Sequence, residues 1–314
     1  MKLYPMKLKP CVKHALWGGR RLVDEYGLPE QDQGKEAGEA WVLSCEGDYQ
    51  NIIVNGPRAG SLFADFYAAN RNTTGSRGGG TERFPVLIKL IDARDDLSVQ
   101  VHPGDEDAPG QGKTEAWYII DCEPGAGLLL GFKRRTGKEV FEKAAGTVEL
   151  LPLLKKIPVK KGDVFLINSG MIHAIGSGMI ILEIQQNSDI TYRVYDYGRP
   201  RKLHIAKAMD VINFSLKAEN LSNTKIKECN GYSISKLCKN KYFAIVKVKV
   251  KSEYKDIGEE ERFHIITCVE GKGIISGNGV VSEIKCGDSF FIPANLEEYK
   301  IQGNMSVLKS YVVI

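Results

Sequence analysis

The sequence lacks any stretch long and apolar enough to cross a membrane as a helix. Its opening residues carry charges and a proline where a secretion signal would have an uninterrupted apolar segment. The seven cysteines are scattered, odd in number and never spaced as Cys-x-x-Cys, which is typical of free thiols in a reducing compartment. We therefore expect a cytoplasmic protein with no membrane partner.

The sequence also has no large excess of charge of either sign. The 43 lysines and arginines nearly balance the 39 acidic residues, and no basic block is long enough for a nucleic-acid-binding arm. The triple glycine at 78–80 lacks the Lys-Ser/Thr that follows in a phosphate-binding loop. These absences argue against nucleic-acid binding and against a P-loop enzyme. The mild net charge of +4 would help attract a small anion.

The sequence consists mostly of short apolar runs separated by turns that contain glycine and proline. This pattern predicts a mainly β protein, a sandwich or barrel with a few short helices. The predicted strands cover residues 39–44, 84–91, 97–101, 116–122, 127–132, 164–168 and 179–185. Helical spacing of apolar residues predicts helices at 61–72, 137–145 and, most clearly, 203–217.

An internal repeat sharpens the predicted architecture. The segment 162–167 (GDVFLI) resembles 287–292 (GDSFFI), and residues 119–131 match 265–277 without a gap. Two such matches in the same order predict two copies of one small jelly-roll barrel. We accordingly expect a first domain at 1–218 with helical insertions, a polar linker at 219–231 and a second domain at 232–314.

The first copy carries a candidate metal site. Gln100 and His102 stand two residues apart on a predicted strand, so they face the same side, and Glu115 follows after a polar loop. Imidazole nitrogen with amide or carboxylate oxygen suits zinc, and also iron, manganese or nickel. This group of candidate ligands needs a second histidine. The candidate is His173, which lies in a tight loop between two predicted strands.

The second copy lacks these ligands when the match is continued without gaps. The residues that then stand opposite Gln100, His102, Glu115 and His173 are Val246, Val248, Glu261 and Glu298. We therefore interpret the second copy as a degenerate domain without metal ligands.

Glu183 lies in an otherwise apolar run, MIILEIQQ, on the strand after His173. A carboxylate there must find a partner or shift its pKa upward. One interpretation is a general base for proton abstraction near neutral pH. The other is a buried ion pair with Arg193, and the two are compatible.

Four motifs in order carry a family resemblance: SVQVHP, KTEAWY, the turn at 170–173 and SDITYRVYDYGRP. They are similar to those of zinc-dependent mannose-6-phosphate isomerases of the cupin type, and in particular of the short bacterial form. The likeness runs from about Trp17 to Arg199, with Asn168 where cupins usually have proline. It implies a two-cupin fold, one Zn²⁺ per chain, a sugar-phosphate substrate and interconversion of mannose 6-phosphate and fructose 6-phosphate.

The resemblance also implies residue roles. It implies zinc ligands at Gln100, His102, Glu115 and His173, and an active-site arginine at Arg193. It further implies substrate contacts at Ser98, Lys113 and Glu183. From the chemistry of aldose–ketose isomerisation we assign catalytic roles to Arg193, Glu183 and Lys113. Ser98, Lys113 and Arg193 are the expected substrate-binding residues, with Arg193 or Lys113 on the phosphate.

Two other functions use a similar ligand set on the same fold. One is an iron- or nickel-dependent cupin oxygenase, and the other is a non-enzymatic sugar-binding cupin. The oxygenase reaction has no use for Arg193 and Lys113 beside the site. A binding module would be expected to lose its metal ligands, and the first copy keeps them.

Overall fold

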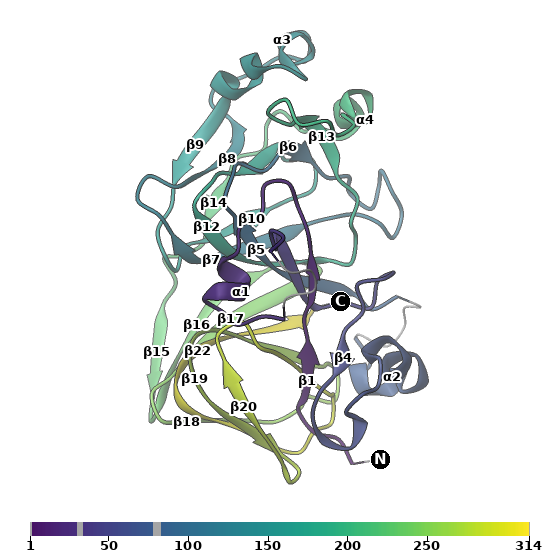
Figure 1. Ribbon diagram of the computed structural model, residues 1–314, viewed down its shortest axis with the longest axis vertical. Helices are drawn as coiled ribbons and strands as arrows, with labels where there is room; N and C mark the ends of the chain where they lie inside the picture. The colour runs from purple at the N-terminus through teal and green to yellow at the C-terminus, as the bar shows by residue number, and fades with distance from the viewer. Residues whose placement is uncertain (1, 30–33, 78–82, 314) are drawn as a thin grey trace.

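The computed structural model describes residues 2–29, 34–77 and 83–313, so the glycines at 78–80 lie outside the described residues. Within these ranges the chain is mainly β, as predicted, and forms three antiparallel sheets of ten, seven and five strands (Figure 1). The pairing order of the strands does not close any of the three into a ring. The fold is therefore built of stacked sheets.

The seven-stranded and five-stranded sheets pack face to face. The first contains β2 (Cys11–Lys13), β3 (Glu39–Leu43), β5 (Val86–Ala93), β7 (Glu115–Cys122), β10 (Val164–Ile167), β12 (Met179–Gln186) and β14 (Glu219–Asn220). The second contains β6 (Val99–Val101), β8 (Gly127–Phe132), β9 (Leu154–Pro158), β11 (His173–Ile175) and β13 (Tyr192–Tyr195). Buried residues from both sheets, including Trp117, Ile119, Leu128 and Leu130, form one core between them.

The ten-stranded sheet covers the other face of the seven-stranded sheet. Its strands are β1 (Met6–Lys9), β4 (Ile52–Ile53), β15 (Ile226–Cys229), β16 (Tyr232–Lys239), β17 (Phe243–Val250), β18 (Glu253–Asp256), β19 (His264–Gly277), β20 (Val280–Lys285), β21 (Ser289–Ile292) and β22 (Tyr299–Val312). Because side chains alternate along a strand, Ala116, Tyr118 and Ile120 of β7 face this sheet while Trp117 and Ile119 face the first core. The seven-stranded sheet is thus buried on both faces.

Two of the helices, α3 and α4, and the turn η3 cover the outer face of the five-stranded sheet. In the described residues the α-helices are α1 (Arg21–Asp24), α2 (Phe63–Ala69), α3 (Lys138–Ala144) and α4 (Ile205–Val211), with 3₁₀ turns η1 (Gly56–Arg58), η2 (Arg71–Thr74) and η3 (Val148–Leu153). Phe141 of α3, Leu150 of η3 and Ala208 of α4 join one core with Val99 and Val101 of β6. None of the described helices is long and apolar enough to span a membrane.

The helix predicted at 203–217 is much shorter in the structure. It ends at Val211 because Ile212 adopts an extended conformation and the Asn213 amide donates to the Gly170 carbonyl at 2.8 Å. Leu216, which fits the helical spacing, packs instead against the core between the two smaller sheets. A tertiary contact therefore overrides the local pattern.

The N-terminal strand crosses the predicted domain boundary. β1 pairs with β21 of the C-terminal half, and β4 pairs with β1. The segment predicted as a linker is extended, with β14 paired to β10 and β15 paired to β16. The division at 1–218, 219–231 and 232–314 stays a prediction.

The sheet register corrects the alignment of the two copies. Phe165 and Phe290 occupy equivalent places after their Gly-Asp turns, and they stand opposite Trp117 and Ile266 respectively. Glu115 therefore corresponds to His264, and the gap-free match to Glu261 was wrong by three residues. A one-residue β-bulge at Ile119/Asp121 in β7 matches the bulge at Cys268/Glu270 in β19, which supports this register.

The same register places Lys309 where the first copy has Glu183. Glu183 stands opposite Trp117, and Lys309 stands opposite Ile266. The Lys309 ammonium lies 2.7 Å from Asp256 Oδ2, which also accepts hydrogen bonds from the hydroxyls of Tyr254 (2.5 Å) and Tyr299 (2.9 Å). Burial opposes ionisation of Asp256, but Lys309 lowers its pKa below the usual value. An ammonium–carboxylate cluster thus organises this part of the second copy.

We predict that Lys309→Met lowers the free energy of unfolding by about 1–3 kcal/mol, because Asp256 keeps its charge and loses its cation. Since the pKa of Asp256 is lowered in the folded state, the loss should shrink as the pH falls through that pKa. The measurement is denaturant unfolding of the metal-saturated protein. Lys255→Met is the control, because its ion pair with Glu253 is exposed and worth less than about 1 kcal/mol. Equal effects of the two substitutions would contradict the assignment.

Candidate metal centre

Three buried side chains converge between the two smaller sheets. His102 directly follows β6, Glu115 opens β7 and His173 opens β11. Their potential ligand atoms all lie within 4.8 Å of one another. Glu115 Oε2 is 3.6 Å from His102 Nε2, and Glu115 Oε1 is 3.4 Å from His173 Nε2. The structure brings together the three residues that the sequence predicted from separate motifs.

Backbone carbonyls fix the tautomer of both histidines. His102 Nδ1 lies 2.8 Å from the Ile190 carbonyl, and His173 Nδ1 lies 2.8 Å from the Met171 carbonyl. A carbonyl only accepts, so each Nδ1 carries the proton and each Nε2 lone pair remains for a metal ion. Burial lowers the pKa of His102 well below its usual value and that of His173 to about 4. Both imidazoles are therefore neutral, the form that binds metal.

Some buried polar atoms of this cluster lack partners. His102 Nε2 and Glu115 Oε1 make no hydrogen bond to any described residue, while Glu115 Oε2 lies 3.0 Å from the Lys113 ammonium. Unpaired buried polar atoms are costly, and a bound cation would satisfy all of them. Two imidazole nitrogens and a carboxylate form a donor set that suits a borderline transition metal. His102, Glu115 and His173 thus fit a metal ion.

Gln100 lies beside this cluster. It pairs directly with His173 across β6 and β11, and its Nε2 is 3.3 Å from His173 Nε2. The Ser98 hydroxyl donates to Gln100 Oε1 at 3.3 Å. To bind a metal the carboxamide would have to present Oε1 in place of Nε2. Its role as a fourth ligand stays a prediction.

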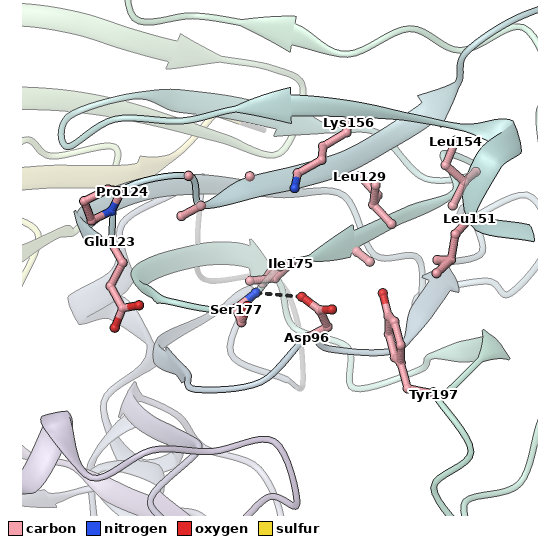
Figure 2. Close-up of a pocket in the computed structure, with 15 residues that line it drawn as sticks. Asp96, Glu123, Pro124, Leu129, Leu151, Leu154, Lys156, Ile175, Ser177 and Tyr197 are labelled. Carbon is pink, nitrogen blue, oxygen red and sulfur yellow. Dashed lines mark hydrogen bonds between the residues drawn. The ribbon is translucent and has the colours of Figure 1, made fainter. Parts of the chain in front are cut away.

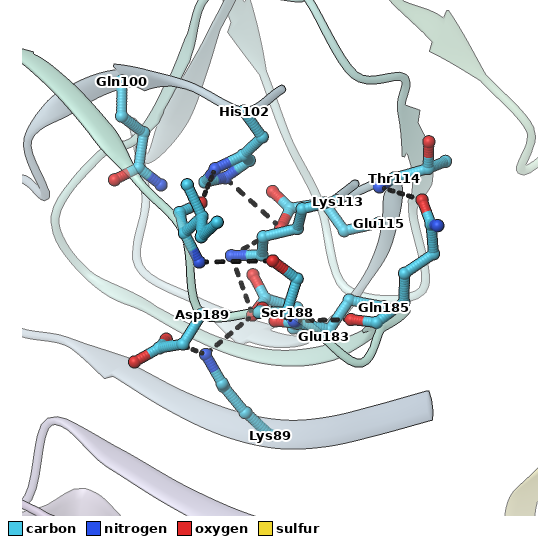
Figure 3. Close-up of polar contacts among 12 residues, drawn as sticks. Lys89, Gln100, His102, Lys113, Thr114, Glu115, Glu183, Gln185, Ser188 and Asp189 are labelled. Atoms are coloured by element: carbon cyan, nitrogen blue, oxygen red, sulfur yellow. Dashed lines mark hydrogen bonds and ion pairs between the residues drawn. The ribbon is translucent and has the colours of Figure 1, made fainter. Parts of the chain in front are cut away.

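Carboxylate and ammonium groups alternate in a row that leads away from Glu115 (Figure 3). Lys113 Nζ lies 3.0 Å from Glu115 Oε2 and 4.0 Å from Glu183 Oε1. Lys89 Nζ lies 3.7 Å from Glu183 Oε1 and 3.3 Å from Asp189 Oδ1. Burial alone would lower the pKa of Lys89, but the neighbouring carboxylates raise it, so the ammonium stays charged. Sequence reasoning missed Lys89, although a lysine inside FPVLIKLI is the same kind of signal as Glu183.

Glu183 is buried at the floor of this network. The indole N–H of Trp117 donates to its Oε2 at 2.9 Å. Burial and the nearby Glu115 carboxylate raise the pKa of Glu183, while Lys113 and Lys89 partly oppose that rise. The structure pairs it with Lys89 and Lys113, so the predicted ion pair with Arg193 was wrong.

Arg193 provides a cation at another wall of the same cleft. Its Nη1–H donates to the Lys202 carbonyl at 3.1 Å, and its buried Nε has no hydrogen-bond partner among the described residues. Burial and then Arg201 lower the pKa of Arg193. Arg201 itself pairs with Asp196. Sequence reasoning missed Arg201, whose position emerges only from the fold.

One cleft of about 350 Å³ connects these groups. The predicted residues that line it are Ser98, Gln100, Lys113, Glu183 and Arg193. A cleft of this size can hold a small molecule. All of the predicted site residues are thus brought to one place, with the buried metal-ligand cluster beside Gln100 and Lys113.

A second hollow, of about 420 Å³, lies beyond Ile175, which lines both cavities. Figure 2 shows its polar side chains, among them Asp96, Ser177 and Lys156, beside leucines of β8 and η3. Asp96 Oδ1 accepts a hydrogen bond from the Ser177 amide at 2.8 Å. Among the described residues, no histidine lines this second hollow, and it lacks Lys89 and Lys113 of the cleft.

The sandwich of sheets with a His/Glu/His cluster between them defines a metal-binding protein of the cupin class. Residues 6–121 match the sequence model of the type I phosphomannose isomerase catalytic domain, and residues 233–312 match that of the mannose-6-phosphate isomerase cupin domain. The two matches fall on the two halves of the chain.

Full-length relatives agree with these matches. The chain is 36% identical to the probable mannose-6-phosphate isomerase GmuF of Bacillus subtilis, covering 98% of this chain and 99% of the relative. It is 34% identical to the mannose-6-phosphate isomerase ManA of the same organism, over 99% and 100% of the two chains. A crystal structure of a B. subtilis mannose 6-phosphate isomerase superposes with a TM-score of 0.87 at 32% identity, covering 98% and 99%. The chain belongs to the mannose-6-phosphate isomerase family.

We predict that His102→Ala and His173→Ala each abolish stoichiometric metal binding, because the remaining ligands cannot hold the ion tightly. Elemental analysis of purified protein gives the metal content per chain. His264→Ala is the matched control, since His264 is also a buried histidine but lies in the ten-stranded sheet. A full metal complement in His173→Ala would refute the site, and metal loss in His264→Ala would mean that the two copies have exchanged roles.

Proposed function

We propose that the chain is a zinc-dependent isomerase that interconverts mannose 6-phosphate and fructose 6-phosphate in the cytoplasm. The observation that carries the proposal is the buried His/Glu/His cluster beside a cleft whose walls hold Glu183, Lys113 and Arg193. The family supports this reaction, and no observation favours the oxygenase or the binding module. The seven free cysteines support a reducing compartment.

We also propose that the two halves are two cupin barrels, with a single zinc in the first. Zinc would be held by His102, Glu115 and His173, with Gln100 as the further ligand. When bound there, the ion supplies positive charge that polarises the substrate oxygens. The equivalent turns and strand pairings of β10–β7 and β21–β19 support the duplication.

Glu183 is the proton carrier in this proposal. Isomerisation requires a base that takes the proton from C2 of the aldose and returns it to C1 of the ketose. Glu183 lines the cleft, lies 4.0 Å from Lys113, and has a raised pKa that suits a base working near neutral pH. The Trp117 N–H holds Oε2, which leaves Oε1 toward the two lysines.

The other charged residues divide between the reacting end and the phosphate end. Lys113, between Glu115 and Glu183, is placed to exchange a proton with a substrate hydroxyl and to offset the charge of the enediolate. Arg193 has an unpaired buried N–H and forms no ion pair in the described residues, which suits both a phosphate and the negative charge that develops in the transition state. The Ser98 hydroxyl orients Gln100 through a hydrogen bond, and Ser98 also lines the cleft.

The decisive experiment follows fructose 6-phosphate formation from mannose 6-phosphate with a coupled assay. We expect turnover that a chelator removes and added zinc restores. We expect Arg193→Ala to retain zinc and to lose on the order of 10²-fold in turnover, the scale of one transition-state contact. Arg262→Ala, which removes an arginine stacked on Tyr311 in the second half, is the control and should turn over normally. One iron per chain with oxygen consumption would refute the proposal.

A second prediction concerns the base. Glu183→Gln should keep its zinc and lose about 10²- to 10⁴-fold in kcat. Because the pKa of Glu183 is raised, kcat/KM of the unaltered enzyme should fall as the pH drops through a value above the usual glutamate range. That acid limb should be absent from the residual activity of Glu183→Gln. Steady-state kinetics against pH test both points, and near-normal kcat in the variant would remove Glu183 as the base.

A further inference from the structure

A second, strongly basic groove lies on the opposite side of the five-stranded sheet from the cleft. It has a volume of about 800 Å³ and runs between the loop from β8 to α3 and the segment after α4 (upper part of Figure 1). Its walls share no residue with the cleft. The size is within the range of small-molecule sites.

Five cations and no acidic residue line this groove. They are Lys133, Arg134, Arg135, Lys138 and Lys217. All five are exposed, and none forms an ion pair with any residue in the described ranges. Like charges gathered without counter-ions repel one another and create a positive potential in a hollow surface. The hollow beyond Ile175, by contrast, balances Lys156 with Asp96 and Glu123.

Two aromatic rings form part of the same surface. Phe132 and Phe214 line the groove and stack on each other with centroids 5.3 Å apart and planes at 18°. Phe141 packs edge-on against both from the core side. Both stacked rings are only half-buried. A flat ligand group can therefore extend the stack, while guanidinium groups nearby bind phosphate oxygens.

We propose that this groove binds a nucleoside di- or triphosphate, with the base on the phenylalanine rings and the phosphates on the arginines and lysines. Five cations exceed what a single phosphate monoester neutralises. The positive surface is also short, because the exposed side chains of Glu139 and Glu142 follow on α3. A long nucleic-acid strand that continued along α3 would meet those carboxylates, which favours a ligand as short as a nucleotide.

The walls of the groove are bonded to the turn that precedes His173. Gly131 N donates to the Ile172 carbonyl at 2.8 Å, and Asn213 N donates to the Gly170 carbonyl at 2.8 Å. The Gly170 amide in turn donates to the carbonyl of His102 at 2.8 Å. The residues next to both walls are therefore joined by backbone hydrogen bonds to the turn between the two histidine ligands.

The test is calorimetric titration of the full-length, zinc-loaded protein with ADP, in saturating fructose 6-phosphate so that the cleft is occupied. We expect saturable binding that weakens as salt increases. The double variant Arg134→Glu/Arg135→Glu should bind ADP at least tenfold more weakly, with unchanged zinc content. The control Lys227→Glu/Lys236→Glu makes the same charge change at exposed positions of β15 and β16 and should bind normally.

A second set of ligands tests the role of the rings. Phe214→Leu should weaken ADP binding and leave inorganic pyrophosphate binding unchanged. Absence of ADP binding at millimolar concentration, or equal binding by the Arg134/Arg135 variant, would overturn the proposal. Pyrophosphate binding as tightly as ADP would exclude the nucleotide, and an oligonucleotide binding more tightly would indicate a nucleic-acid surface instead. Because each measurement is of binding, failure here leaves the isomerase proposal untouched.

Discussion

The buried polar cluster of Glu115, His102 and His173 is the constraint on which the site depends. Lys113 pairs with one oxygen of the Glu115 carboxylate, but His102 Nε2 and Glu115 Oε1 have no hydrogen-bond partner in the described residues and are costly to bury unless a metal ion joins them. The carbonyls of Ile190 and Met171 fix the ring orientations before any ion arrives. The sheets therefore position the ligands, and the ion would supply the partner that these atoms lack.

Charge balance in the cleft follows from the same alternation that builds the core. Along β5 and β12 every second side chain faces the space between the two smaller sheets. Near the cleft these residues are Lys89 and Glu183, and further along the strands they are Ile91 and Ile181, which belong to the core. The paired strands set Lys89 directly opposite Glu183. One face of the sheet thus carries charged residues near the cleft and apolar residues further along. The charged side chains of the cleft are therefore held on rigid strands beside a packed core.

The sequence indicated the strands and the ligands more reliably than the helices and the register. Strand alternation and the Gln-x-His pair depend on local spacing, so β5, β7, β12 and the metal cluster were predictable. The helix predicted at 203–217 was longer than the observed one, because a tertiary hydrogen bond from the Asn213 amide ends the helix early. No local sequence pattern encodes that bond. The Lys89 contacts depend on which strands become neighbours, and Arg201 reaches the cleft from the segment after β13, which spacing alone does not reveal.

The second half of the chain illustrates how the same framework can hold a different polar core. At the positions of Glu115 and Glu183 it carries His264 and Lys309, and the Lys309 ammonium lies against Asp256, which two tyrosine hydroxyls also contact. Lys309 is part of the chain, so Asp256 always has its cation. In the first half Lys113 pairs with one oxygen of Glu115, but His102 Nε2 and Glu115 Oε1 have no hydrogen-bond partner among the described residues and remain available to a metal ion. Retention of β1 in the ten-stranded sheet then ties the two copies together through backbone hydrogen bonds, so neither half can shift without breaking a strand pairing.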